Sequence, residues 1–405
     1  MEALMENLAR ILDSFHPGST QSEYIGSLMR IVREFVIPSY PVLEARIENN
    51  KAQFSEGWEG LFLALKDARI LAYFVPTQYG GLKASEQDIY VMMELFGYSS
   101  PGLGVIFVSH GRAIDLILHG TEEQKQRFLP RLAHSEIGAI AMTEEKAGSD
   151  ASAIGLMAKR DGDRFVLNGE KVFISNSGLA QIYTILARTK EEKGPRSLST
   201  LVVEHGLEGF SIKDLPKKEG LRVLPTGRLV FRNTKVPSLN LVGEEERGLL
   251  LALDVIDRGR IHIAGICCGL SYRIFREIYR FAYRRRQFDH PLTSSQDISF
   301  QIADMYCQMN AARGLCFHAL NQVGTPNYRL SSSQAKLFAT RAVMDVASRA
   351  QVLMGGRGYL RNSLINQLCA DARGMEYLEG TSNVQKMIMG RELFRIYHKE
   401  ANNLG

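Results

Sequence analysis

The amino-acid sequence predicts an α+β protein with three parts, helical, then β, then helical. Hydrophobic residues recur at three- and four-residue steps before about residue 135 and again after Gly243, as they do in amphipathic helices. Between Gly138 and Gly243 the period changes to two, which is the period of strands. The length of 405 residues is enough for roughly two to three domains, and we expect divisions at 1–137, 138–245 and 246–405.

The first part is expected to be helical from about Thr20 to Ser135. The helical period is clear in Glu86 to Phe96 and in Thr121 to Leu132. Thr121 and Gln124 have the spacing of a capping box, and two acidic residues follow Thr121 in the first turn. We therefore expect a helix to begin there.

The second part contains short segments with the period of strands. These segments are Arg164 to Leu167, Ile182 to Ala187, Leu201 to Glu204 and Arg228 to Phe231. Asn168 and Gly169 follow the first segment and both tolerate positive φ, so they predict a hairpin turn at this point.

The third part begins with a long helical segment whose apolar stripe runs from Leu249 to Phe288. Arg260 and Arg285 also fall on this stripe. Either each arginine lies at the edge of the stripe and extends its charged head to water, or both face an anion inside a packed assembly. The sequence leaves these two alternatives open.

Composition excludes several classes of protein. With 45% hydrophobic and 23% charged residues the chain is an ordinary globular protein, and a net charge of +5 is too small to indicate a nucleic-acid partner. The five cysteines are never spaced as CxxC, so we expect a reducing compartment and no metal site. No apolar run approaches the roughly 18 residues of a membrane span, and the start at Met1 lacks signal-peptide features. We expect a cytoplasmic protein.

Familiar catalytic motifs are missing from the sequence. There is no GxGxxG after a strand, no GxxxxGK loop and no GxSxG elbow, and the nine histidines never have metal-ligand spacing. These observations argue against a nicotinamide Rossmann enzyme, a P-loop enzyme and a zinc hydrolase.

Two segments of the β part carry candidate binding residues. Ala141 to Asp150 leaves a strand as a loop of hydroxyl and small residues, which suits a polar planar ligand or a phosphate. The alternative is a solvated turn. Lys171 to Asn176 places Phe173 and Ser175 on one strand face, where the alternative is a core aromatic beside an exposed serine.

Two further segments lie in the last part. Ser382 and Gln385 have capping-box spacing, so Glu379 should lie just before a helix start whose free amides suit a phosphate. The alternative is that Glu379 is an ordinary surface acid. Gly355 to Gly358 follows a helical run and most simply ends a helix.

In this order and spacing, these segments resemble the acyl-CoA dehydrogenase flavoprotein family. The family motifs have forms close to TExxAGSD, LNGxKxxIxN, RxQFG, QxxGGxG and EGTS. The chain shows each in full or with one departure, at Thr143 to Asp150, Leu167 to Asn176, Arg285 to Phe288, Gln351 to Gly358 and Glu379 to Ser382. The resemblance covers roughly Glu23 to the C-terminus. It implies an N-terminal helical domain, a central β-barrel-like domain and a C-terminal four-helix bundle.

The resemblance also implies that FAD binds between the β domain and the bundle. Residues that match flavin contacts are Met142, Thr143, Ser149, Phe173 on the ring face, Ser175 at flavin N5, Thr381 and Asn383. Residues that match contacts with the FAD of a neighbouring subunit are Arg285, Phe288, Gln296, Gln351 and Gly356. A homo-oligomer, dimer or tetramer, is therefore implied.

Glu379 matches the catalytic base of the family, which removes the α-proton of an acyl thioester while a hydride passes from Cβ to flavin N5. Hydrogen bonds to the thioester carbonyl, from the backbone N–H of the base and from FAD, stabilise the developing charge. Burial should raise the pKa of Glu379 toward the working range. A related branch carries its base immediately before the residue matching Arg260, but Gly259 stands there in this chain. The residues expected at the substrate are Ser149, Arg260, Leu378 and Gly380.

Several positions depart from the family pattern. Phe173 replaces the common Trp, Leu378 replaces an aromatic before the base, Met354 adds a residue before the paired glycines, and Asp289 replaces a glycine. These changes are compatible with an unusual acyl group, or with a thioester on a carrier protein instead of CoA.

The expected function is FAD-dependent α,β-dehydrogenation of an acyl thioester to the 2-enoyl thioester. Electrons would pass to an electron-transfer flavoprotein or another acceptor. Two alternatives are a non-catalytic flavin-bound homologue with a binding or protective role, and an acyl thioester oxidase that uses O₂.

Overall fold

The computed structural model describes residues 23–40, 56–82, 84–192 and 194–403. The start of the predicted helical part at Thr20 and residues 41–55 lie outside the described residues. The first region is helical, with short 3₁₀ or π turns between the longer helices. Its elements are α2 (Glu23–Ile31), η1 (Val32–Val36), α4 (Glu56–Asp67), η2 (Ile70–Phe74), η3 (Thr77–Tyr79), α5 (Glu86–Ser99), α6 (Pro101–Ile117) and α7 (Glu122–His134).

The middle region is a mixed sheet with strand order β6-β7-β3-β2-β4-β5-β8, with β1 paired to β4 in parallel. Among the described strands, β6 and β8 form its two edges. The strands are β1 (Gly138–Ala141), β2 (Met157–Asp161), β3 (Arg164–Ser175), β4 (Ile182–Arg188), β5 (Leu198–Glu204), β6 (Phe210–Asp214), β7 (Thr226–Pro237) and β8 (Leu241–Val242), with turns η4 (Ala151–Ala153), η5 (Pro195–Ser197) and η6 (Ser238–Asn240).

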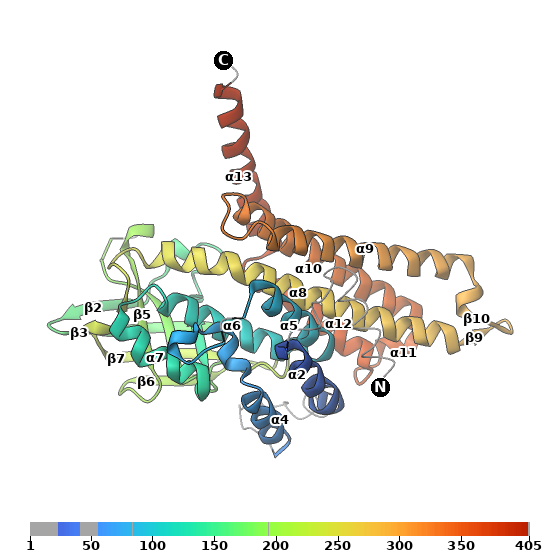
Figure 1. Ribbon diagram of the computed structural model, residues 1–405, viewed down its shortest axis with the longest axis horizontal. Helices are drawn as coiled ribbons and strands as arrows, with labels where there is room; N and C mark the ends of the chain where they lie inside the picture. The colour runs from blue at the N-terminus through green and yellow to red at the C-terminus, as the bar shows by residue number, and fades with distance from the viewer. Residues whose placement is uncertain (1–22, 41–55, 83, 193, 404–405) are drawn as a thin grey trace.

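The last region is a bundle of long helices built around α8, which forms one continuous rod through the molecule (Figure 1). A small hairpin follows α8, and the C-terminal part of α13 projects away from the other helices. The elements are α8 (Gly248–Arg284), β9 (Arg286–Gln287), β10 (His290–Pro291), η7 (Leu292–Ser294), α9 (Gln296–Leu320), α10 (Tyr328–Met354), α11 (Gly356–Tyr359), α12 (Leu364–Met375) and α13 (Ser382–Asn403).

The predicted fold class is confirmed, since helices, a sheet and a helical bundle follow one another along the chain. The Thr121 capping box is also confirmed, because the Thr121 hydroxyl accepts from the Gln124 amide and the Gln124 side chain accepts from the Thr121 amide. The predicted hairpin at Asn168–Gly169 is wrong. Strand β3 continues through both residues, with a shift in its register against β7, so the positive φ of Gly169 serves a bulge.

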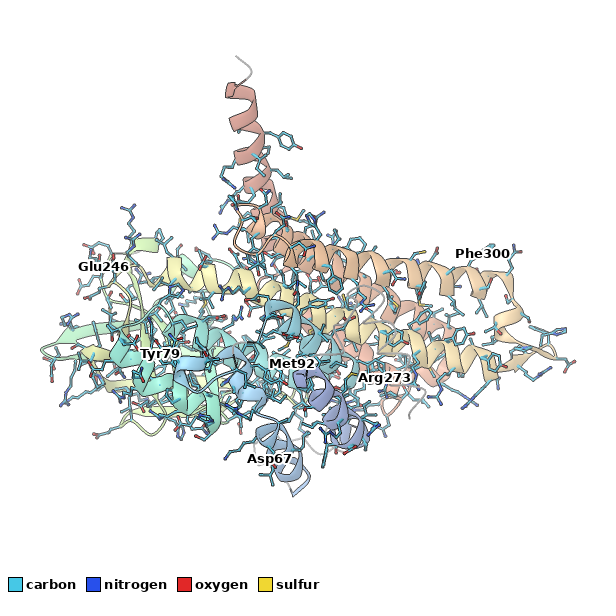
Figure 2. The ribbon with its side chains drawn as sticks, viewed as in Figure 1. Asp67, Tyr79, Met92, Glu246, Arg273 and Phe300 are labelled. Atoms are coloured by element: carbon cyan, nitrogen blue, oxygen red, sulfur yellow. The ribbon has the colours of Figure 1, made fainter. Side chains whose placement is uncertain are left out.

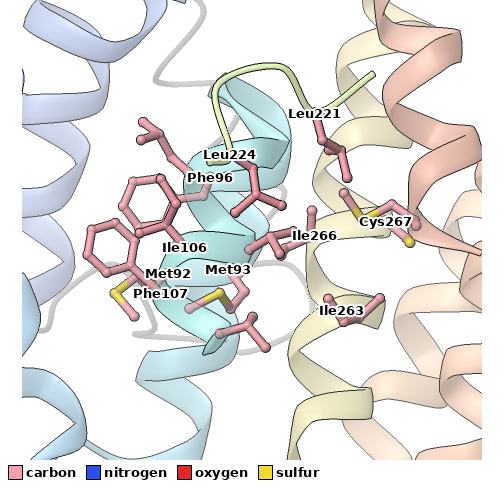
Figure 3. Close-up of a cluster of buried hydrophobic side chains, with 14 of the residues drawn as sticks. Met92, Met93, Phe96, Ile106, Phe107, Leu221, Leu224, Ile263, Ile266 and Cys267 are labelled. Atoms are coloured by element: carbon pink, nitrogen blue, oxygen red, sulfur yellow. The ribbon is translucent and has the colours of Figure 1, made fainter. Parts of the chain in front are cut away.

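Helices α5, α6 and α8 share one buried core with the loop that precedes β7. Figure 3 shows Phe96 of α5, Phe107 of α6, Leu224 of the loop and Ile266 of α8 in this cluster. The rings of Phe96 and Phe107 stack with centroids 5.0 Å apart. This core therefore joins the N-terminal helices to the bundle.

Glycines set the distance between α5 and α8. A Cβ atom on Gly269 of α8 would lie 1.9 Å from the carbonyl oxygen of Glu94, and one on Gly97 of α5 would lie 2.1 Å from that of Ile266. The two backbones are therefore as close as glycine alone permits. The close approach places the α5 side chains directly against the middle of α8.

Asp371 of α12 links three parts of the chain. Its buried carboxylate accepts a hydrogen bond from the Tyr40 hydroxyl (2.7 Å) and one from the Leu221 amide (2.6 Å). Burial raises the pKa of Asp371 to about 6, although both hydrogen bonds oppose this rise. The carboxyl group therefore favours its protonated form in the folded protein more than in the unfolded chain.

We predict that Gly269→Ala lowers the free energy of unfolding by about 1–3 kcal/mol or more, because α5 must move away from α8. Chemical unfolding followed by circular dichroism measures this change. Gly314→Ala on α9 is the matched control, since nothing lies within 4 Å of a Cβ at that position. Equal stability of the two variants would contradict the proposed close packing.

We predict that Asp371→Asn changes how stability depends on pH. The folded pKa of about 6 lies above the ordinary value of 3.8, so the contribution of this group is complete at low pH and declines as pH rises through 6. Between pH 5 and pH 7 the unmodified protein should lose roughly 1 kcal/mol relative to the Asn variant. Urea unfolding of both proteins at the two pH values measures this, and parallel pH dependence would refute it.

Candidate active site

The candidate base, Glu379, lies in a turn between α12 and α13 that has a left-handed backbone. The φ angles are 51° at Glu379 and 89° at Gly380. A left-handed conformation is unfavourable for a residue with a long side chain and persists only where surrounding contacts hold it. The contacts of this turn are therefore the first feature of the site to explain.

Two side chains hold the backbone of the turn. The amine of Lys336 on α10 donates to the carbonyl oxygens of Glu376 (3.1 Å) and Gly380 (2.8 Å). The side-chain amide of Gln385 donates to the carbonyls of Glu379 (3.0 Å) and Gly380 (2.9 Å). The predicted capping box of Ser382 and Gln385 is therefore wrong, because the Gln385 side chain is directed to these carbonyls.

The side chain of Glu379 rests on α8. A Cβ atom built on Gly259 would lie 2.6 Å from the Glu379 Cδ and 2.7 Å from its Oε2. The carboxyl group thus fills the space that any other residue at position 259 would need. The structure brings Glu379, Gly259 and the neighbouring Arg260 together, as expected.

Arg260 is buried, with 3% of its surface exposed, and forms an ion pair with Asp257 on the same helix. Asp257 also pairs with Arg329 of α10 at 2.7 Å, and the Ser333 hydroxyl lies 3.4 Å from the Arg260 guanidinium. The sequence left open whether Arg260 extends its charged head to water or faces an anion inside the protein. Its burial shows that the first alternative is wrong for Arg260. Arg285 lies just past the end of α8 and is exposed in the single chain.

A second buried arginine flanks the base. Arg112 of α6 donates to the Val255 carbonyl (2.9 Å), lies 3.3 Å from the His262 Nδ1 and pairs with Asp115. Val255, Gly259 and His262 are separated by four and three residues, so they share one face of α8. Arg112 therefore spans the helix face on which the Glu379 carboxyl group rests.

Burial raises the pKa of Glu379 above its ordinary value of 4.5. The positive charges of Arg112, Arg260 and Lys336 oppose this rise, and the negative charge of Asp115 adds to it. A half-buried carboxylate with a raised pKa and cations on several sides can accept a proton and remain in place in both protonation states.

The predicted flavin residues of the β region lie side by side. Lys171 of β3 is fully buried, and its amine donates to the Met142 carbonyl (2.9 Å) and the Glu144 carboxylate (2.8 Å). The Thr143 carbonyl accepts from the Val172 amide at 2.9 Å. These bonds fix the start of the loop against β3, beside Phe173 and Ser175.

Phe173 is held out of the core by a backbone irregularity. The pairing of β3 with β7 shifts between Lys171 and Ile174, and within this shift Phe173 has a φ of 58° and is 63% exposed. An aromatic ring exposed by a strained bulge beside a hydroxyl residue, Ser175, fits a planar ring such as the isoalloxazine of FAD. Ser149, in the same loop as Thr143, is exposed.

Other predicted residues lie far from the base within one chain. Arg285, Phe288 and Gln296 surround the small hairpin after α8, and Phe288 is 93% exposed at its tip. Gly259 and Arg284 are 25 positions apart on one helix, which corresponds to about 38 Å. A single copy of the chain therefore does not bring these side chains to Glu379.

Gln351 and Gly356 also lie away from the base, near the end of α10. The side-chain amide of Gln351 donates to the Asn366 side chain of α12 at 2.8 Å. Gly356 is exposed, with nothing within 4 Å of a Cβ at this position. Leu378 and Thr381 flank the base turn and are half-buried, whereas Asn383 is exposed.

Lys171, Lys336 and Arg112 were not identified from the sequence. Each is a buried charge within a strand or helix. For Lys336 the sequence carries a signal, because the residues three and four positions away on α10 are all small, namely Ser332, Ser333, Ala339 and Thr340. A charge on a face of small residues is a signal of a buried polar contact. The identity of its partners depends on the tertiary structure.

Comparisons with known proteins agree with the fold and with the motifs. Family models described as the acyl-CoA dehydrogenase N-terminal, middle and C-terminal domains match residues 24–136, 139–234 and 246–394. The chain is 36% identical over 323 residues to a short-chain-specific acyl-CoA dehydrogenase of Clostridium acetobutylicum, which covers 78% of this chain and 85% of that protein.

Two solved structures have the same architecture. Butyryl-CoA dehydrogenase from Megasphaera elsdenii has a TM-score of 0.86 and 29% identity, over 92% of this chain and 98% of that chain. A structure described as an electron transferring flavoprotein of Acidaminococcus fermentans also has a TM-score of 0.86, with 28% identity, over 93% and 98%.

The matched domains and relatives define an FAD-dependent oxidoreductase of the acyl-CoA-dehydrogenating type. The chain belongs to the acyl-CoA dehydrogenase family. Within the described residues, no helix is long and apolar enough to cross a membrane, and no group of three or more potential metal ligands is found.

We predict that Gly259→Ala lowers the rate of flavin reduction strongly and has a smaller effect on the stability of the protein. The added methyl group would take the space of the Glu379 carboxyl group, which must then rotate away. The rate constant for flavin reduction by an acyl thioester should fall by on the order of 10-fold or more. Rapid-mixing absorbance measures it, and Gly314→Ala, with the same chemical change on an open helix face, should keep the unmodified rate.

Proposed function

We propose that this protein catalyses the α,β-dehydrogenation of an acyl thioester and that Glu379 removes the α-proton. The observation that carries the proposal is the position of the Glu379 carboxyl group, which lies against Gly259 because hydrogen bonds hold the turn. Burial also raises the pKa of this carboxyl group. A carboxylate buried without such a role would cost stability. The same arrangement suits a general base.

The residues of the chain have separate tasks in the proposed reaction. FAD, when bound, supplies the acceptor for the hydride from Cβ. Glu379 takes the α-proton, and Arg112, Arg260 and Lys336 keep the carboxylate ionised before the reaction. The backbone N–H of Glu379 is the proposed donor to the thioester carbonyl, where negative charge develops.

The proposed FAD and substrate residues divide into two groups. Met142, Thr143, Ser149, Phe173 and Ser175 would bind the flavin from the β region, with Ser149 also near the thioester. The second group lies in or beside the turn that carries Glu379. Three of its members, Arg260, Leu378 and Gly380, would contact the substrate, and the other two, Thr381 and Asn383, would bind FAD. Support comes from the fixed loop against β3 and from the exposure of the Phe173 ring.

We propose that the protein works as a homo-oligomer, dimer or tetramer. Arg285, Phe288, Gln296, Gln351 and Gly356 would then reach the FAD of a neighbouring copy, which agrees with their distance from Glu379 within one chain. Large exposed apolar side chains support an assembly. They include Phe288 on the hairpin, Phe300 on α9 (Figure 2) and Phe394 on α13.

The proposed substrate is a thioester of CoA or of a carrier protein. Leu378 next to the base gives the acyl group an aliphatic neighbour. The proposed electron acceptor is an electron-transfer flavoprotein or another acceptor of electrons from the reduced flavin. Reoxidation by air of the thioester-reduced protein distinguishes the oxidase alternative, in which O₂ restores the flavin absorbance rapidly.

We predict that acyl thioesters bleach the flavin absorbance of the purified protein without oxygen, and that Glu379→Gln slows this bleaching by a factor of at least about 10³. In the unmodified protein the rate should fall as pH decreases through the raised pKa of Glu379, because only the ionised form accepts a proton. Anaerobic stopped-flow absorbance measures both effects.

The matched control is Glu245→Gln, which removes an acid that pairs with Arg160 at the surface of the β region. This variant should retain the unmodified rate. If Glu379→Gln bleaches as fast as the control, Glu379 is not the base. If no CoA or carrier-protein thioester of any chain length bleaches the flavin, the non-catalytic alternative is favoured.

A further inference from the structure

Lys336 is a buried charge that is not among the residues proposed to contact the substrate or FAD. It lies on α10, and its amine has converging contacts with the segment that joins α12 to α13. The Glu376 carbonyl that it binds precedes Glu379 by three residues, and the Gly380 carbonyl follows Glu379 directly. One amine therefore bridges the backbone on both sides of the proposed base.

Gln385 completes this attachment from α13. Its side-chain amide donates to the carbonyl of Glu379 itself and to that of Gly380, so Gly380 accepts hydrogen bonds from both side chains. The carbonyls therefore point toward α10 and α13. Hydrogen bonds from side chains of these two helices hold the left-handed φ of Glu379. The side chain is then directed to Gly259 on α8.

The turn is held by two buried polar side chains, which is unusual for a loop. Both Lys336 and Gln385 are fully buried, and burying an amine is costly unless hydrogen bonds and nearby opposite charge compensate it. The Lys336 amine donates two hydrogen bonds to carbonyl oxygens, whose partial negative charge lies close to the base. A long apolar side chain would fill the same space at lower cost, so the amine indicates a requirement of the site.

We propose that Lys336 and Gln385 are positioning residues that hold Glu379 at the α-carbon of the substrate, and that Lys336 in addition stabilises the ionised base. This inference rests on the proposed function of Glu379. Gln385 is neutral and can act through geometry alone, whereas Lys336 can act through geometry and charge. The pair therefore allows the two contributions to be separated.

The charges that surround Glu379 and Lys336 determine the apparent pKa that a pH profile of the rate would give. Glu379 faces Arg112 and Asp115 of α6, Arg260 of α8 and Lys336 of α10. Lys336 faces Cys267 and Arg260 of α8, Glu376 at the end of α12, and Glu379. Burial lowers the pKa of Lys336, and the acidic groups oppose this. Removal of Lys336 leaves two cations, Arg112 and Arg260, near the base.

The first experiment compares Lys336→Met and Gln385→Met with the unmodified holoenzyme, using anaerobic flavin reduction by an acyl thioester over a range of pH. Both variants should lower the maximal rate constant by on the order of 10-fold, because the base is misplaced. The apparent pKa of the rate should rise by roughly half a unit to one unit in Lys336→Met alone. Gln385→Met should leave it unchanged.

The matched control is Lys218→Met. The amine of Lys218 also donates to two backbone carbonyls, those of Leu221 (2.8 Å) and Leu224, and to the Thr226 hydroxyl (2.9 Å), but in the loop before β7. This variant should lower the unfolding temperature while the rate and its pKa stay unchanged. A control that reproduced the Lys336→Met profile would assign the effect to general destabilisation and overturn the proposal.

Hydrogen exchange gives a readout that does not depend on activity. In both Lys336→Met and Gln385→Met, amides in residues 376–385 should exchange faster than in the unmodified protein, whereas Lys218→Met should affect residues 215–226 instead. If Lys336→Met fails to fold, the rate of flavin reduction and the hydrogen exchange of Gln385→Met still test the positioning role. Unchanged exchange and unchanged rates in Gln385→Met would overturn the positioning role.

The outcomes also separate this inference from the proposed function. If the unmodified protein is reduced by a thioester and both variants match it in rate, pKa and exchange, the positioning role is wrong while the function of Glu379 stands. If Glu379→Gln is as fast as the unmodified protein, the proposed function fails first, and with it the catalytic part of this inference.

Discussion

The left-handed turn at Glu379 is the constraint on which the rest of the candidate site depends. A non-glycine residue with positive φ costs on the order of 1 kcal/mol or more, and the bonds from Lys336 and Gln385 offset this cost. These bonds require α10 and α13 to meet at the turn, and α8 must pass beneath it with Gly259. The long helices thus act as rigid supports for one carboxyl group.

Much of the fold could be predicted because periodicity is a property of single segments. The predicted segments Ile182 to Ala187 and Thr121 to Leu132 nearly coincide with β4 and α7, whereas Arg228 to Phe231 covers only part of β7. Asn168–Gly169 was misassigned because the same two residues suit a tight turn and a bulge. The choice between them depends on Asn233 of β7, whose amide bonds the Asn168 side chain (2.8 Å) and continues the pairing.

The candidate site could be predicted as far as its residues form motifs along the chain. Glu379 was identified with its neighbours, although the helix start beside it was misread, since Gln385 serves the turn instead of a cap. Arg112 and Lys336 have no motif, and their relation to the base arises only where α6, α8 and α10 converge. The FAD contacts of Arg285 and Phe288 stay predictions, because they involve a second copy of the chain.

The contact between Gly259 and Glu379 has a consequence for which position can carry the acid. The two positions are 120 residues apart in the sequence, yet a side chain at either one would occupy the same small volume. An acid on α8 at position 259 would therefore place its carboxyl group in nearly the same volume as the acid in the turn at 379. Only one of the two positions can carry a side chain that fills this volume, and in this chain it is Glu379.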